Sequence, residues 1–192
     1  ENRVLTTAEI QNAAATFEGL DMGVPYIAQI FYNEVLRGTL NTKTSGSSGS
    51  LIFNINIPGI TAEDISTALA GHAAEGTKKV TVNFASGMEF NMEGTITIPT
   101  GIQDISFVGS ENANGKLSQL NKVYFAIESE VNDVNFEYLS MNSDGGFMFQ
   151  VGAQKFHDIT FEGCEVKQVN SAVRLHSGAE GNSVNFNNCW VS

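Results

Sequence analysis

The sequence is short of cysteine, of basic residues and of long apolar runs, and each shortage excludes a class of protein. Two cysteines form no disulfide framework, leave the redox compartment open and, with three histidines, argue against a structural zinc cage. Ten Lys and Arg against 21 Asp and Glu give a net charge of −11, which repels a phosphate backbone. No stretch approaches the roughly 20 apolar residues that cross a bilayer. We therefore expect no nucleic-acid partner and no membrane span in this chain.

The residues that are present favour a folded, β-rich protein. Hydrophobic residues make up 42% of the chain and charged residues 16%, with 19 Gly and 13 Phe, which excludes a disordered tail and a coiled coil. Since domains usually run to roughly 100–200 residues, the length suits one large domain, or one medium domain plus a fragment.

The second half of the sequence repeats itself with a period of about 25 residues. The three copies occupy residues 133–136, 158–161 and 183–186, and each has an apolar residue, a polar residue and then Phe. The same offset relates Leu139, Cys164 and Cys189. A weaker copy at residues 104–107 lies slightly further from the first of these than one period, because residues 111–116 add a polar loop. The alternation of apolar and polar residues is the period of a β-strand.

A further strand is expected between the copies, at residues 123–127, 147–151 and 172–176. We align Phe125 with Phe149 and Phe149 with Leu175, so that one spacing is slightly shorter than the period and the next slightly longer. A unit with three short strands cannot bury its own apolar face, whereas units stacked ~4.8 Å apart align their inward columns into one core. The sequence therefore predicts an all-β fold, a parallel β-helix with about 25 residues per turn.

A helix is expected before the first strands of this β-helix. Residues 61–64 resemble a capping box, and Gly76 ends the segment that follows. Its apolar residues fall near one helical face: Ile65, Ala68, Leu69 and Ala73. We expect this helix to cover the N-terminal mouth, with residues 80–84 and 95–99 as strands of the first turn. Because the chain stops within a repeat, we expect the β-helix to be truncated at its C-terminal end or covered there by another segment.

The first 46 residues have a different pattern. Leu20, Gly23 and Tyr26 match the Leu-x-x-Gly-x-x-Tyr corner of fibronectin type III domains, although Met22 stands where that family often has Pro. Residues 1–46, with strands expected at 26–32 and 36–44, thus resemble the C-terminal part of such a β-sandwich. The Ser- and Gly-rich residues 47–50 are expected to be a linker, and residues 51–192 the β-helix.

The order of the expected elements is the basis of a second resemblance. A capping helix followed by Ile-x-Phe-x-x-Cys turns resembles pectate-lyase-like right-handed β-helices. Together with the fibronectin-like segment, the chain is similar to uncharacterised surface lipoproteins of Bacteroides-type bacteria that accompany glycan-utilisation machinery. The resemblance implies a right-handed β-helix, a polysaccharide ligand, an extracellular or outer-membrane surface location and a lipid anchor on the parent chain. We expect a monomer.

Five outward-facing residues are the candidates for carbohydrate binding: Arg174, His176, Trp190, Glu165 and Lys155. Arg174 and His176 lie two apart on one expected strand and so project together. Trp190 shares an outward column with Glu165, and its indole either offers an apolar face to a sugar ring or packs against a segment outside this sequence. Lys155 is expected nearby.

The sequence leaves the question of catalysis open. A lyase that acts on uronate-containing glycans needs a base, a cation and usually calcium, and Arg174 would supply the base or the cation. No paired or tripled Asp cluster accompanies it, and Asp144 has no evident partner for hydrolysis. We therefore expect a non-catalytic glycan-associated protein without a cofactor. The alternatives are a lyase whose calcium-dependent site is completed beyond Ser192, and a structural spacer or adhesin.

Three further patterns have a structural interpretation that we prefer. Asp104, Asp133 and Asp158 each precede a strand, where a metal ladder is conceivable but the capping of local backbone N–H groups is the simpler role. We assign no metal site. Cys164 and Cys189 are expected to be a buried thiol ladder and not a disulfide, because stacked side chains on parallel strands point the same way. The repeated Phe residues are expected in the core and not on a sugar-binding platform.

Overall fold

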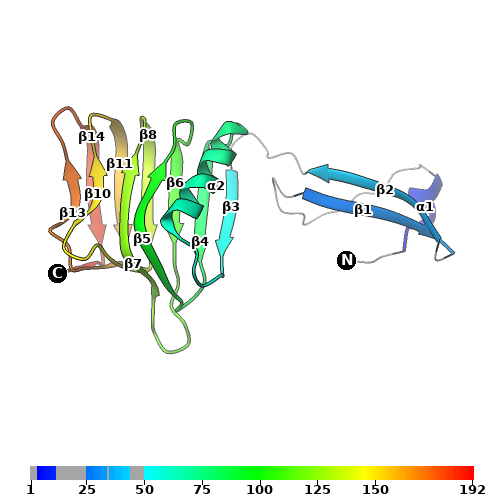
Figure 1. The fold of residues 1–192 in the computed structure, drawn as a ribbon, viewed down its shortest axis with the longest axis horizontal. Coiled ribbons are helices and arrows are strands. Elements are labelled where there is room, and N and C mark those ends of the chain that lie inside the picture. The colour runs from blue at the N-terminus through cyan, green and yellow to red at the C-terminus, as the bar shows by residue number, and fades with distance from the viewer. Residues whose placement is uncertain (1–3, 12–24, 34, 44–49) are drawn as a thin grey trace. The chain divides into compact units, whose positions relative to one another are not determined.

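The computed structural model describes residues 4–11, 25–33, 35–43 and 50–192, and the chain divides into two compact units, Glu1–Ser45 and Gly46–Ser192. The first unit contains a short helix α1 (Thr7–Gln11) and an antiparallel pair of strands, β1 (Pro25–Tyr32) and β2 (Val35–Lys43) (Figure 1). This pair coincides with two predicted strands. Leu20, Gly23, the Tyr26 side chain and residues 47–49 of the predicted linker lie outside the described part.

The second unit is a β-solenoid whose first face is a six-stranded sheet (Figure 1). Its strands follow the order β3, β4, β6, β8, β11 and β14, and every neighbouring pair is parallel. Their bounds are Ser50–Ile55, Lys79–Phe84, Asp104–Val108, Val131–Glu137, Lys155–Glu162 and Glu180–Asn187. The predicted all-β stack of parallel turns is therefore confirmed.

The other strands of each turn form a seven-stranded parallel sheet that covers the two remaining faces. These strands are β5 (Glu89–Ile98), β7 (Ser118–Ile127), β9 (Leu139–Asn142), β10 (Phe147–Val151), β12 (Glu165–Lys167), β13 (Ser171–Leu175) and β15 (Trp190–Val191). The long strand β7 joins both faces, because residues 118–120 pair with β9 and residues 125–126 with β10. At the corner after the first face, Tyr138, Gly163 and Asn188 have φ of 51°, 60° and 52°, a left-handed conformation.

The repeated Phe residues form a continuous stack inside the solenoid. Phe136 and Phe161 have ring centroids 4.6 Å apart and nearly parallel planes, as do Phe161 and Phe186 at 4.7 Å. Phe107 stacks on Phe136 at 5.4 Å and completes the column. The rings of Phe107, Phe136 and Phe161 are fully buried. Phe186 is 43% exposed because it lies on the last turn of the described chain. The predicted alignment of these four residues is confirmed.

Two details of the strand prediction were wrong. Strand β3 precedes the strand that was expected to be first and pairs with β4 through Leu51↔Val80 and Ile55↔Phe84. The helix lies between these two strands in the sequence, so their spacing is longer than the repeat. A single fixed period therefore does not predict this turn. The residue opposite Phe149 is Val173, and Leu175 lies opposite Val151. The spacing from Phe149 to Val173 equals that from Phe125 to Phe149, and the expected Phe149–Leu175 pairing is incorrect.

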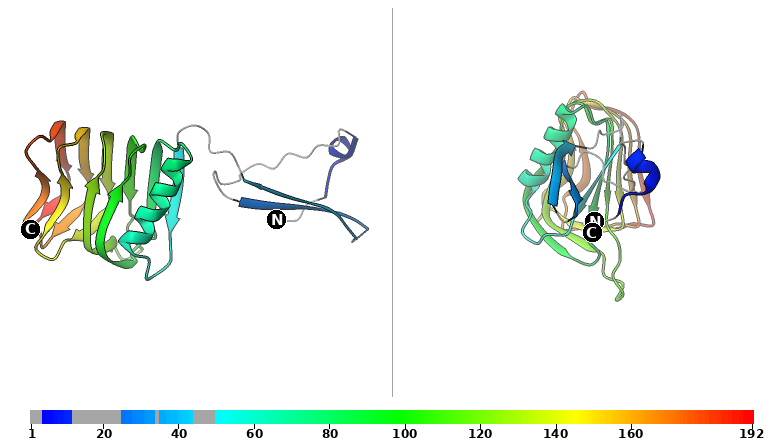
Figure 2. Two further views of the ribbon diagram at one scale, coloured as in Figure 1. Left: turned by 45° about the horizontal axis from the view of Figure 1, so that its top comes forward. Right: turned by 90° about the vertical axis from the view of Figure 1, so that its right-hand side faces the viewer.

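The predicted capping helix is present as α2 (Ala62–Ala74). Its capping box is complete, since Asp64 donates its backbone N–H to Thr61 Oγ1 at 3.2 Å and accepts from the Thr61 N–H at 2.9 Å. Ile65 and Leu69 are fully buried. Ser66 Oγ donates to the Ala62 carbonyl at 2.8 Å and accepts from the Thr97 N–H at 2.9 Å, so the helix satisfies a backbone donor of the edge strand β5. Figure 2 shows α2 along the end of the solenoid at which β3 lies.

We predict that Phe136→Ala lowers the free energy of unfolding by about 3–5 kcal/mol, because it leaves a cavity between two stacked rings. Thr160→Ala, on the outward side of β11, is the control and should cost less than about 1 kcal/mol. Urea unfolding followed by circular dichroism measures both. A Phe136→Ala loss no larger than that of the control would contradict the stacked core.

Candidate functional site

An open groove crosses the first strand of three successive turns, near the start of β8, β11 and β14. Its volume is ≈ 440 Å³. The residues that line it are Glu130, Val131, Asn132, Lys155, Phe156, His157, Glu180, Gly181 and Asn182. Each of the three turns contributes three consecutive residues, at equivalent positions of the repeat.

The walls of the groove are two polar columns. Glu130, Lys155 and Glu180 form one column of alternating charge, and Asn132, His157 and Asn182 form the other. Parallel register places equivalent residues side by side, as in Lys155↔Glu180. Lys155 Nζ lies 2.6 Å from Glu180 Oε2. This contact raises the pKa of Lys155 and lowers that of Glu180, while both side chains stay largely exposed.

The floor of the groove is apolar and depends on one glycine. Val131 and Phe156 are buried beneath the polar columns. A Cβ on Gly181 would lie 2.0 Å from Phe156 Cζ, so only glycine lets the ring extend beneath the last turn. The groove thus combines an apolar base with hydrogen-bonding walls.

Two consecutive outward residues follow the floor on each of β8 and β11. Along β11, Phe156 and Ile159 are both buried, so His157 and Asp158 between them both face away from the core. The same pattern on β8 places Asn132 and Asp133 outward between Val131 and Val134. This break in strict alternation brings an imidazole next to two carboxylates.

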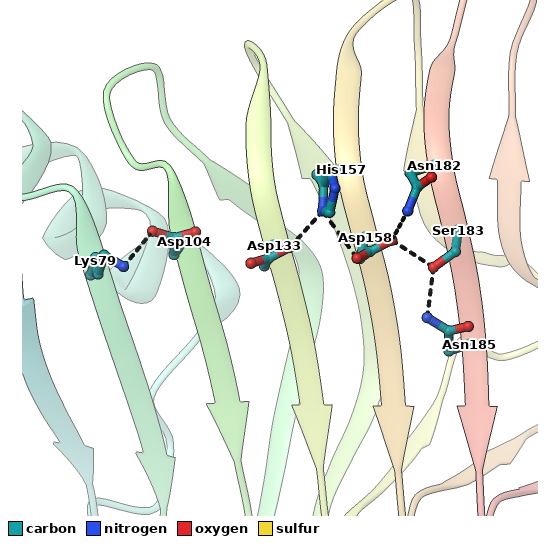
Figure 3. A network of polar contacts seen from close by, with 8 residues as sticks. All are labelled: Lys79, Asp104, Asp133, His157, Asp158, Asn182, Ser183 and Asn185. Carbon is teal, nitrogen blue, oxygen red and sulfur yellow. Dashed lines mark hydrogen bonds and ion pairs between the residues drawn. The ribbon is translucent and has the colours of Figure 1, made fainter.

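The carboxylates and the imidazole form a network with side chains of β14 (Figure 3). His157 Nδ1 lies 3.0 Å from Asp158 Oδ2 and 3.4 Å from Asp133 Oδ1. On the other side, Ser183 Oγ and Asn182 Nδ2 donate to Asp158 Oδ1 at 2.6 and 3.0 Å. These two hydrogen bonds are the main reason that the pKa of Asp158 lies below its usual range, with a smaller contribution from His157.

The structure distributes the five predicted binding residues over three faces. Lys155 lies in the groove. Glu165 and Trp190 lie opposite each other on β12 and β15, as predicted, and the Trp190 residue is 55% exposed. Lys167 forms an ion pair with Glu165, and its Nζ lies 5.8 Å from the centre of the Trp190 ring. These residues make a small patch separate from the groove.

Arg174 and His176 belong to the third face, at β13. The Arg174 guanidinium lies 4.3 Å from the centre of the Phe147 ring, a cation–π contact with the neighbouring turn. His176 Nε2 lies 3.4 Å from Gln150 Oε1. The five residues therefore do not converge on one site.

Sequence reasoning missed the residues that do converge, above all His157. Asp133 and Asp158 were predicted to cap local backbone, whereas in the structure both carboxylates also contact the His157 side chain. The recurrence of Asn132, His157 and Asn182 with the period of the repeat was the available signal. Asp104, the third member of the predicted Asp ladder, differs because its carboxylate contacts Lys79 Nζ at 3.1 Å.

Both cysteines are free thiols on neighbouring turns. Cys164 is buried and its Sγ donates to the Phe136 carbonyl at 3.3 Å, while Cys189 Sγ accepts from the Cys164 N–H at 3.4 Å. Burial raises the pKa of Cys164 to about 12, so this thiol is protonated and chemically inert at neutral pH. The predicted stacking of two free thiols is confirmed, whereas the predicted burial holds for Cys164 and not for Cys189, which is partly exposed.

The chain matches no protein-family model, no curated protein and no solved structure. Among the described residues, neither helix has the length and apolar character that crossing a membrane requires. Function is therefore inferred from the geometry of the groove and its neighbourhood.

We predict that the two thiols of the native protein react at different rates with a disulfide reagent such as DTNB. Cys189 should be modified readily because it is partly exposed, and Cys164 only after unfolding. Peptide mass spectrometry assigns each site, and equal labelling in denaturant is the control. Equally rapid modification of both native thiols would show that Cys164 is not sealed in the core.

We predict that Ser183→Ala raises the pKa of Asp158 towards its ordinary value, because it removes the shorter of two hydrogen bonds to the carboxylate. A carboxyl pKa that is lower in the folded chain than in the unfolded chain stabilises the fold above the unfolded value. That stabilisation is lost as the pH falls through the folded value. NMR titration of the Asp158 carboxyl checks the shift, with Ser106→Ala, on another turn of the same face, as the control. An unchanged pKa would show that Ser183 does not hold the carboxylate.

Proposed function

We propose that this protein is a glycan-binding β-solenoid that holds a polysaccharide along the groove over β8, β11 and β14 without cleaving it. The groove is the observation that carries the proposal. It is open to solvent, it has an apolar floor and its two polar walls repeat from turn to turn.

The chemistry of the walls suits sugar hydroxyls, which both donate and accept hydrogen bonds. The carboxylates of Glu130 and Glu180 accept, the Lys155 ammonium donates, and the amides of Asn132 and Asn182 do both. Equivalent groups recur at the strand spacing of about 4.8 Å along the solenoid axis. A polymer laid along that axis meets similar groups at regular intervals, whereas an open groove encloses a small molecule poorly.

The finer features of the fold are part of the same proposal. We propose a right-handed, pectate-lyase-like coil, which the strong preference of parallel β connections for that hand supports. The antiparallel pair β1–β2 supports the tail of a fibronectin type III-like domain in the first unit. The resemblance on which these assignments rest also supports a location at the extracellular or outer-membrane surface, with a lipid anchor on the parent chain. We also propose a monomer.

We predict that the protein binds at least one polysaccharide in a panel of neutral and uronate-containing glycans. The double variant Glu130→Ala, Lys155→Ala should weaken this binding at least fivefold, because it removes an acceptor and the donor of one wall. Affinity electrophoresis in gels that contain each glycan measures the change. Lys79→Ala is the matched control, because Lys79 lies on the same sheet outside the groove.

Variants of the other exposed residues locate the ligand if it lies elsewhere. Loss of binding in Trp190→Ala or Arg174→Ala, with the groove variant unaffected, would overturn the groove as the site. Absence of binding to every glycan would favour a spacer or adhesin. Unsaturated products that absorb ultraviolet light, formed from uronate-containing glycans with calcium, would establish the lyase alternative.

A further inference from the structure

Three potential metal ligands meet beside the groove, on two neighbouring turns (Figure 3). They are one carboxylate oxygen each from Asp133 and Asp158 and the Nδ1 atom of His157, and all three atoms lie within 4.8 Å of one another. Asp133 comes from β8, while His157 and Asp158 are consecutive in β11. The set is a mixed nitrogen and oxygen cluster, and its imidazole distinguishes it from an ordinary acidic patch.

The two separations that involve the imidazole match those of ligands around one ion. Zinc lies about 2.0–2.2 Å from imidazole nitrogen and carboxylate oxygen, so two ligands at the tetrahedral angle are about 3.4 Å apart and two at a right angle about 3.0 Å. His157 Nδ1 is 3.4 Å from Asp133 Oδ1 and 3.0 Å from Asp158 Oδ2. The imidazole therefore lies at ligand distance from both carboxylates.

The Asp158 carboxylate is already oriented for this role. Its Oδ1 atom accepts hydrogen bonds from Asn182 and Ser183, and its Oδ2 atom faces His157. Ser183 is positioned in turn by Asn185, whose Nδ2 donates to Ser183 Oγ at 2.7 Å. Outer hydrogen bonds of this kind fix the direction of a ligating oxygen and are a usual feature of protein metal sites.

The preceding turn shows what the same column looks like without an imidazole. Asp104 lies opposite Asp133 in the register of β6 and β8, but its carboxylate is neutralised by Lys79. At Asp133 and Asp158 the neighbouring group is His157, which in its neutral form offers a lone pair and leaves both carboxylate charges to the ion. One turn of the ladder is therefore an ion pair, and the next two turns supply a chelating group.

We propose that Asp133, His157 and Asp158 form a binding site for a borderline divalent transition-metal ion such as Zn²⁺. An imidazole with two carboxylates suits zinc and its first-row neighbours, whereas calcium takes six to eight oxygen ligands. The side chains of His157 and Asp133 are 65% and 45% exposed, so the ion lies at the surface with coordination positions open to water or to an oxygen of a bound molecule. His157 also lines the groove, but the proposed metal binding requires no glycan.

Titration calorimetry of the full chain with ZnCl₂, in metal-free buffer without glycan, tests this site. We expect one Zn²⁺ per chain, and we expect His157→Gln and Asp133→Asn each to weaken its binding at least tenfold. His176→Gln and Asp104→Asn are the matched controls, an exposed histidine on another face and the aspartate of the same column one turn earlier. Both should bind zinc within twofold of the parent chain.

The absorption spectrum of the Co²⁺-loaded protein identifies the ligand atoms independently. Nitrogen and oxygen ligands give only weak visible bands, whereas a thiolate ligand adds an intense near-ultraviolet band. That band would place the ion on a cysteine and overturn the proposal, as would the absence of zinc binding or unchanged binding in a His157→Gln variant with a native circular dichroism spectrum. Because no glycan is present, none of these outcomes bears on the groove as a sugar site.

Discussion

In-register pairing of parallel strands is the constraint on which the rest of this molecule depends. Each Phe of the central column contacts the equivalent ring of the next turn, and this contact requires that the strands between them pair without a shift. A slip by one residue would exchange the inward and outward sets of a whole strand. The hydrophobic gain of burying the rings therefore also fixes which polar side chains meet outside.

The polar surface follows from the same register. Acidic, basic and amide side chains become columns only because their positions recur with the turns, and the groove lies where two such columns flank an apolar base. Its one irregular feature is the pair of consecutive outward residues at the start of β8 and β11. That irregularity places His157 beside Asp133 and Asp158, so the chemically distinctive part of the surface arises where alternation is interrupted.

The sequence predicted the parts of the fold that depend on repetition and on local capping. The Phe column follows from the regular period, and α2 from its capping box and apolar face. Strand β3 was missed because the helix lies between it and the next turn, and Leu175 was misaligned because the strands of that face recur at a slightly shorter interval. Alternation predicts only that each candidate binding residue faces outward, and a one-dimensional pattern does not tell on which face it lies. Strict alternation around the buried Ile159 turns His157 inward, so the pattern does not predict its place beside the two aspartates.

A solenoid turn contacts only the turns before and after it, so its energetics are those of neighbouring pairs. The corner residues Tyr138, Gly163 and Asn188 show that the three turns that contain β8, β11 and β14 close in the same way, with a single left-handed residue. Duplication of one such unit within the gene would lengthen the groove by one further set of wall residues and leave every existing pairing intact. The length of the groove, and so the length of polymer that it contacts, can therefore change in evolution by whole turns, independently of the stability of the original turns.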